Sequence, residues 1–115
     1  MQRLRRECYP AIVAIVLVNQ QLVRAIAERR LIQFSYKRTG ARVVEPHDYG
    51  VHAGIERLLG YQLRGQSRSG AAQGWKWFDV ASLADLTLLD DTFPGTRADA
   101  SQHHAGWDRL FARVS

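Results

Sequence analysis

Between residues 31 and 89, apolar and polar side chains alternate in a series of short runs, and this alternation constrains the fold more than any other feature of the sequence. In the first run, residues 32–37, Ile32, Phe34 and Tyr36 alternate with polar neighbours. A period of two predicts β-strands with one buried face. Because the runs are short and follow one another through turn residues, they indicate an antiparallel sheet and not a parallel βαβ arrangement.

A helix is expected before the first strand, over residues 21–30. Leu22 and Ile26 lie on one face of such a helix, and arginines occupy its last turn, where the helix dipole favours cations. Pro46 is expected to end the second strand, since proline has no N–H to donate to a ladder. The expected strands cover residues 32–37, 42–45, 47–51, 57–63, 75–80 and 83–89.

The end of the chain carries a different spacing of apolar residues. Trp107, Leu110, Phe111 and Val114 stand at positions i, i+3, i+4 and i+7, which predicts a short amphipathic C-terminal helix. One helix, five or six short strands and a closing helix together predict a small twisted antiparallel barrel of the α+β class.

The length of 115 residues fits one domain. Cys8 is the only cysteine and cannot form an internal disulfide, so we expect a reducing compartment and a cytoplasmic protein. Three segments are expected: an apolar extension over residues 1–20, the barrel domain over residues 21–93, and a linker with the short helix over residues 94–115.

The extension begins with three arginines, and an unbroken apolar run over residues 8–18 follows them. This run is shorter than the roughly 20 residues that a helix needs to cross a bilayer. Three interpretations stay open: a buried or partner-covered helix, which we favour, a non-native upstream start, and a membrane anchor, which we favour least.

The net charge is +5, and it is unevenly distributed. Residues 1–76 contain 13 basic and 5 acidic side chains, whereas residues 77–115 contain 3 and 6. Fourteen of the 16 basic residues are arginines, whose planar guanidinium suits phosphate and carboxylate groups. The excess indicates either an anionic ligand, such as nucleic acid, or simply a solvated basic surface.

Signs of catalytic or metal chemistry are weak. Ser67 and Ser69 lie in a glycine-bearing loop that does not have the form of a nucleophile elbow, so we predict no enzymatic activity. Asp48 could join two histidines as metal ligands, but His47 and His52 are five residues apart and are expected on opposite faces of an extended chain. We therefore predict neither a metal site nor a cofactor.

Several pieces of the sequence follow one another in the order and spacing of a known bacterial family. They are the helix over 22–30 running into 32–36, then 44–47, 58–61, 77–78 and 83–93. Over residues 22–93 the chain resembles a WYL domain, although the Trp-Tyr-Leu positions fall on Glu56, Arg57 and Leu58, so that only the leucine is kept. The resemblance implies a five-stranded SH3-like or Sm-like barrel preceded by a helix. It also implies a non-enzymatic, ligand-sensing or regulatory module.

Members of that family are thought to bind nucleic acid or oligonucleotide ligands in a groove of basic and aromatic side chains. We expect such a groove here, holding single-stranded nucleic acid or an anionic small ligand. The residues expected to form it are Tyr36, Arg42, His47, Arg57, Tyr61 and Lys76.

A second hypothesis belongs to another functional class. Apolar side chains are concentrated over residues 11–18 and again at Trp107, Leu110 and Phe111. Apolar surface in excess of what one core needs marks an interface. The alternative function is therefore a protein–protein interaction module or a homo-oligomer subunit without a small ligand.

Overall fold

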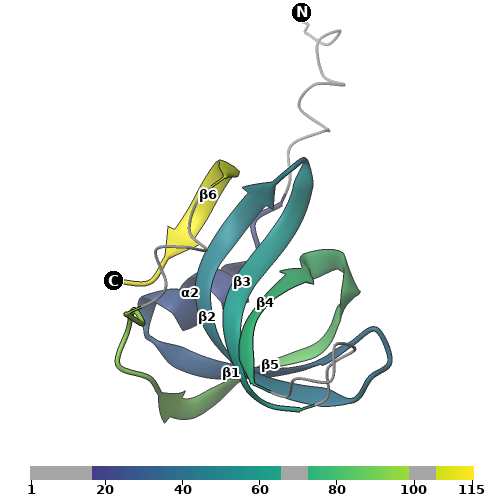
Figure 1. Ribbon diagram of the computed structural model, residues 1–115, viewed down its shortest axis with the longest axis vertical. Coiled ribbons are helices and arrows are strands. Elements are labelled where there is room, and N and C mark those ends of the chain that lie inside the picture. Colours follow the sequence, from purple (N-terminus) through teal and green to yellow (C-terminus); the bar gives the residue numbers. More distant parts are fainter. Residues whose placement is uncertain (1–16, 66–72, 99–105) are drawn as a thin grey trace, which may run out of the picture.

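The computed structural model describes residues 17–65, 73–98 and 106–115 (Figure 1). The apolar run of the expected N-terminal extension lies almost wholly outside these residues, so its three interpretations remain predictions. Most of the loop with Ser67 and Ser69 lies outside them as well.

One helix, six strands and one 3-10 turn make up the described residues. Every strand pairing is antiparallel, as the alternation predicts. Along the sheet the strands follow the order β4-β3-β2-β1-β5, and β6 pairs with β2 off this path. The elements are α2 (Gln20–Ala27), β1 (Arg30–Tyr36), β2 (Ala41–His52), β3 (Ile55–Arg64), β4 (Gly74–Asp79), η2 (Val80–Ser82), β5 (Leu83–Thr92) and β6 (Trp107–Arg113).

Helix α2 begins at an N-cap and ends earlier than the expected residue 30. The Asn19 side chain accepts hydrogen bonds from the backbone N–H groups of Gln21 and Leu22, which satisfies two of the free donors at the helix start. At the other end, Arg29 adopts a left-handed conformation with φ of 54°. Arg30 pairs with Thr92 of β5, so the chain belongs to the sheet from this residue onward.

The sheet is strongly curved, because its two outer strands are joined by a very short connection. Strands β4 and β5 lie four positions apart in the sheet, which in a flat sheet would separate them by about 19 Å. Only η2 joins them, and four residue steps span at most about 14 Å. Curling also brings β1 to the end of β4, where the Asp79 N–H donates to the Tyr36 hydroxyl over 2.9 Å.

This curved sheet differs from the closed five-stranded barrel expected from the sequence. Within the described ranges, no ladder joins β4 to β5, and a sixth strand, β6, has been added. The protein is therefore a compact antiparallel domain with one helix and an open six-stranded sheet.

Helix α2 packs on one side of the sheet, against β1, β2 and β6 (Figure 1), and its buried residues belong to the same core cluster as those of the strands. Leu22, Ala25 and Ile26 are the buried residues of the helix. Three aromatic rings meet edge to face at the centre of the sheet, with centroids of Phe34 and Tyr36 each 5.0 Å from that of Phe78. Members of the core cluster from the strands include Ile32, Phe34, Tyr36, Val44, Tyr49, Leu58 and Phe78.

Strand β2 runs through Pro46, contrary to the expectation that the proline ends a strand. Its first half pairs with β1 as far as Val44, and its second half pairs with β6 from Asp48 onward. Pro46 lies between these two partners, at a point where neither strand needs its missing N–H. The strands expected over 42–45 and 47–51 are therefore one continuous strand of 12 residues.

The expected C-terminal helix is wrong, because Trp107–Arg113 forms strand β6. The edge of β2 beyond the end of β1 provides the partner, with Val51 opposite Arg109 and His52 opposite Trp107. Gly50 permits the approach, since a Cβ at this position would lie 2.1 Å from the Arg109 carbonyl oxygen. Residues 94–115 thus end in a strand of the main sheet and not in an appended linker and helix.

No helix in the described part of the chain combines the length and the apolar character needed to cross a membrane.

Candidate binding site

The six residues expected to form one groove are divided between the two faces of the sheet. Side chains that are directly opposite in a ladder share a face. Lys76 is opposite Gly60 and alternates with Trp77, which places it on the core face with Tyr36 and Arg42. The other three predicted residues, His47, Arg57 and Tyr61, belong to the second face of the sheet.

Tyr36 and Arg42 are components of the core. Both are almost completely buried, and the Arg42 guanidinium lies over the Tyr36 ring, 5.1 Å from its centroid. Arg42 also donates to the Thr39 hydroxyl over 2.6 Å and to the Gln62 side chain over 3.4 Å. These contacts hold the β1–β2 turn and do not present the guanidinium to a ligand.

A β-bulge explains why the second face is richer in functional groups than the alternation predicts. The register of β2 against β3 shifts between Pro46 and Asp48, so that Glu45 is opposite Tyr61 and Asp48 is opposite Leu59. The extra residue, His47, turns toward the same side, because its ring lies 4.7 Å from that of Trp75. The expectation that His47 and His52 lie on opposite faces is therefore wrong.

Aromatic rings from four strands gather on this second face, which we call the tryptophan face. His52 and Trp77 have centroids 4.4 Å apart at an interplanar angle of 34°, and Trp107 lies 5.4 Å from Trp77. Further along β4, Trp75 lies 5.5 Å from Tyr61. The rings of the tryptophan face are His47, His52, Tyr61, Trp75, Trp77 and Trp107.

The tryptophan face is open to solvent along β4. Trp77 is 37% exposed although it is one of the largest apolar side chains of the protein. Tyr61, Trp75 and Trp107 are half-buried, whereas the His47 side chain is fully buried. Exposed tryptophan in contact with other rings is unusual on a surface that has no ligand or partner.

The His52 ring is held in one orientation and one tautomer. Arg57 donates from its terminal nitrogen to His52 Nδ1 over 3.1 Å, and since guanidinium only donates, Nδ1 is the acceptor. The ring proton therefore resides on Nε2. Arg57 is fixed in turn by Asp79, with 3.2 Å between Nε and the carboxylate.

Two buried carboxylates on β2 tie the end of the chain to this face. Arg97 donates to both oxygens of Glu45 over 2.9 Å each, and its guanidinium lies 3.5 Å from the centroid of the Tyr61 ring. Arg113 donates to both oxygens of Asp48 over 3.1 and 3.0 Å. Such bidentate pairs are geometrically specific as well as strong.

The chemistry that this arrangement can support is recognition by ring faces. The arginines on the tryptophan face are paired with carboxylates, so they stiffen the aromatic rings and partly neutralise the local charge. Among the residues that the structure describes, no group of three histidine, cysteine or acidic side chains could hold a metal ion.

The six residues expected in the groove do not include His52, Trp75, Trp107 or Arg97, which the structure brings to this face. Trp75 and Trp77 alternate with Lys76 and Phe78 in the expected strand over residues 75–80, which predicts that the two tryptophans share one side, and the structure confirms it. Nothing local in the sequence connects Trp107 or Arg97 to this face, because both residues belong to the C-terminal segment.

Comparison with family models, with curated proteins and with solved structures finds no match to this chain.

Proposed function

We propose that this protein is a non-enzymatic binding module that holds single-stranded nucleic acid against the tryptophan face. One observation carries the proposal. Trp77 presents a partly exposed ring whose orientation is held by contacts with His52 and Trp107, which also contact one another. Stacking of a base on such a ring contributes about 1–3 kcal/mol and tolerates any base, because every base has a π-face.

Rigidity of the platform supports the proposal further. Arg57 orients His52, and the Asp48 carboxylate accepts a hydrogen bond from the Trp107 indole N–H over 3.2 Å. Rings that are fixed before binding lose little conformational entropy when a base stacks on them. The net charge of +5 adds a long-range attraction for a polyanion.

The WYL resemblance and the barrel that it implies are part of the same proposal. The order β4-β3-β2-β1-β5, the preceding helix and the short turn η2 support an SH3-like or Sm-like relationship. We place the module in the cytoplasm, where its single cysteine would stay reduced.

The test is fluorescence anisotropy with a labelled oligothymidylate. We expect Trp77→Ala to weaken binding at least about fivefold, which corresponds to the lower limit for losing one stacked base. Because phosphate contacts release counterions, affinity should also fall as salt rises from about 50 to 200 mM. Absence of binding at the lower salt concentration would refute the proposal.

A pair of charge variants gives a matched control. Arg57→Gln and Lys76→Gln each remove one positive charge from neighbouring strands, but from opposite faces of the sheet. Only the first also releases the His52 ring. Arg57→Gln should therefore weaken binding more than Lys76→Gln, and equal effects would show that charge alone accounts for the affinity.

A second candidate function is a protein–protein interface on the same face, either with another protein or with a second copy of this chain. Tryptophan, tyrosine and arginine are the residues that dominate binding energy at protein interfaces, and Trp77 and Leu110 are large apolar side chains exposed on β4 and β6. Hydrophobic association does not weaken with salt, whereas nucleic-acid binding does. A dimer that persists at high salt and dissociates in Trp77→Ala would favour this candidate.

A further inference from the structure

A pocket of about 530 Å³ opens between helix α2 and strand β5, and it shares no residue with the tryptophan face. This volume is within the range of about 300–1,000 Å³ that small-molecule sites occupy. Helix α2, strand β1 and strand β5 all contribute to its walls. Its lining residues are Gln20, Gln21, Arg24, Arg30, Leu86, Thr87 and Leu88.

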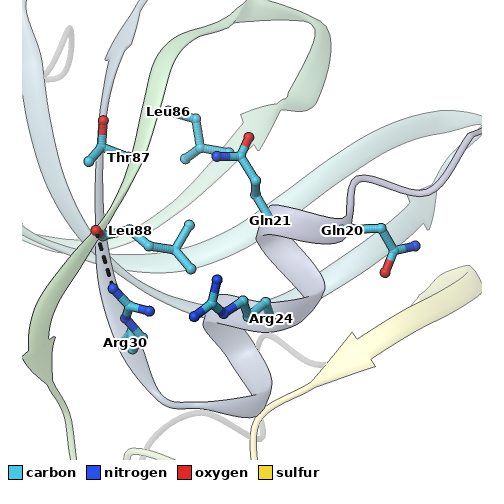
Figure 2. A pocket seen from close by; sticks show the side chains of 7 residues that line it. All are labelled: Gln20, Gln21, Arg24, Arg30, Leu86, Thr87 and Leu88. Carbon is cyan, nitrogen blue, oxygen red and sulfur yellow. Dashed lines mark hydrogen bonds between the residues drawn. The ribbon is translucent and has the colours of Figure 1, made fainter.

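Two guanidinium groups define one end of the pocket. Figure 2 shows the side chains of Arg24 and Arg30 turned toward one another beside Leu88. Arg30 is anchored, because its Nε donates to the Leu89 carbonyl over 2.8 Å and its terminal nitrogen reaches the Leu88 carbonyl. Arg24 is 64% exposed and donates only its Nε, to Glu28, among the described residues. Its two terminal amino groups remain for a ligand.

Glu28 lies between the two arginines and sets the charge of the site. Its carboxylate accepts from Arg24 over 2.9 Å and from Arg30 over 3.3 Å. These hydrogen bonds, first from Arg24 and then from Arg30, lower the pKa of Glu28 below its usual value. Arg30 also lies 3.7 Å from the carboxylate of Asp90, which is fully exposed to solvent. Two cations and two carboxylates leave no net charge, so an anionic ligand would be held by the terminal amino groups of Arg24 that no described residue engages.

The rest of the pocket is apolar with a few polar groups. Leu86 and Leu88 are half-buried and supply an aliphatic wall, as Figure 2 shows. The Gln21 amide lies next to Leu86 in Figure 2. Aliphatic walls with a guanidinium at one end match a molecule that has an aliphatic body and one anionic head.

We infer that this pocket binds an amphipathic monocarboxylate, a small molecule whose carboxylate is held by Arg24, next to the anchored Arg30, and whose aliphatic chain lies on Leu86 and Leu88. The site goes beyond the proposed nucleic-acid binding and does not depend on it. An added peptide strand on β5 is a poorer occupant, because the left-handed Asp85 and the register shifts against β1 interrupt this sheet edge.

The test is an NMR titration of the full ¹⁵N-labelled chain with sodium hexanoate, at ionic strength matched with sodium chloride. We expect saturable shifts of the backbone amides of residues 86–88 and of the Gln21 side chain. Hexanol, which lacks the anionic head, and acetate, which lacks the chain, should each bind at least about fivefold more weakly. Equal affinity for hexanol and hexanoate would overturn the inference.

Two variants and one control locate the site. Arg24→Gln should weaken hexanoate binding about tenfold through loss of a charge-assisted hydrogen bond, and Gln21→Glu should abolish it by placing a like charge in the pocket. Both side chains are exposed, so neither change disturbs the core. Arg64→Gln, the same loss of charge at an exposed site on β3, should leave binding unchanged. Identical affinities of the Arg24 and Arg64 variants would contradict the site.

The Trp77→Ala variant separates this inference from the proposed function. It should bind hexanoate as the unmodified protein does, even where it no longer binds an oligonucleotide. A parallel loss of hexanoate binding in Trp77→Ala would contradict two independent sites.

Discussion

Replacing Tyr49 by phenylalanine removes one hydroxyl that joins the helix, the sheet and an acidic side chain. Tyr49 is fully buried, and its hydroxyl donates to the carboxylate of Glu56. The same oxygen accepts the backbone N–H of Asn19, the N-cap of α2, over 2.7 Å. Phenylalanine fills the same volume, so the variant isolates these polar contacts from packing.

The expected cost of Tyr49→Phe follows from those two contacts. A hydrogen bond to a charged group contributes about 1.5–3 kcal/mol, and a backbone donor left without its partner costs about 1–3 kcal/mol, of which water near the helix start recovers a part. We therefore expect the free energy of unfolding at neutral pH to fall by about 2–4 kcal/mol, measured by urea denaturation.

The same residue predicts how stability changes in alkali. Burial, and after it the hydrogen bond to Glu56, raises the pKa of Tyr49 well above its usual value of 10.0. Above pH 10 the Tyr49 hydroxyl thus keeps its proton in the folded state but loses it in the unfolded chain. This contribution to stability is complete below pH 10 and is lost above it, by up to about 1.4 kcal/mol per pH unit.

Urea denaturation from pH 8 upward through about pH 11 therefore tests the account. The unmodified protein should lose stability above pH 10 more steeply than Tyr49→Phe, so that the difference between the two narrows. Parallel curves through this range, or a neutral-pH difference below about 0.5 kcal/mol, would refute the role of the hydroxyl.

Two further variants test how β6 is attached. Arg113→Met leaves the fully buried Asp48 carboxylate without its bidentate partner, so the free energy of unfolding measured by urea denaturation should fall by about 2–4 kcal/mol. Arg113→Lys should show an intermediate loss. A loss below about 0.5 kcal/mol in Arg113→Met would contradict the pairing. Gly50→Ala places a Cβ against the Arg109 carbonyl and should therefore increase amide hydrogen exchange throughout residues 107–113. Unchanged protection of these amides would contradict the close approach of β6.

Local pattern was sufficient for most elements of the fold. Helix α2 and strand β3 appear where the sequence predicts them, with limits shifted by a few residues. A glycine inside a strand, such as Gly60, predicts a close approach of another backbone, and a Cβ there would lie 2.8 Å from the Glu45 carbonyl oxygen. These features depend on residues that are neighbours in the sequence or on one strand.

What could not be predicted depends on contacts distant in the sequence. The apolar spacing of Trp107, Leu110 and Phe111 is compatible with a helix or with a strand. The segment forms a strand because the second half of β2 has an edge with which it can pair. The same edge lets β2 continue through Pro46. The bulge at His47 has no local signal either, yet it brings Glu45 and Asp48 to one face and so creates much of the candidate site.

All three tryptophans of the chain lie on the tryptophan face, so their indole N–H resonances report on this face directly. The central claim is that single-stranded nucleic acid stacks there. Titration of the ¹⁵N-labelled protein with oligothymidylate should shift the Trp77 indole resonance saturably, with the same affinity that anisotropy gives. Binding by anisotropy while all three indole resonances stay unchanged would place the nucleic acid elsewhere and contradict the claim.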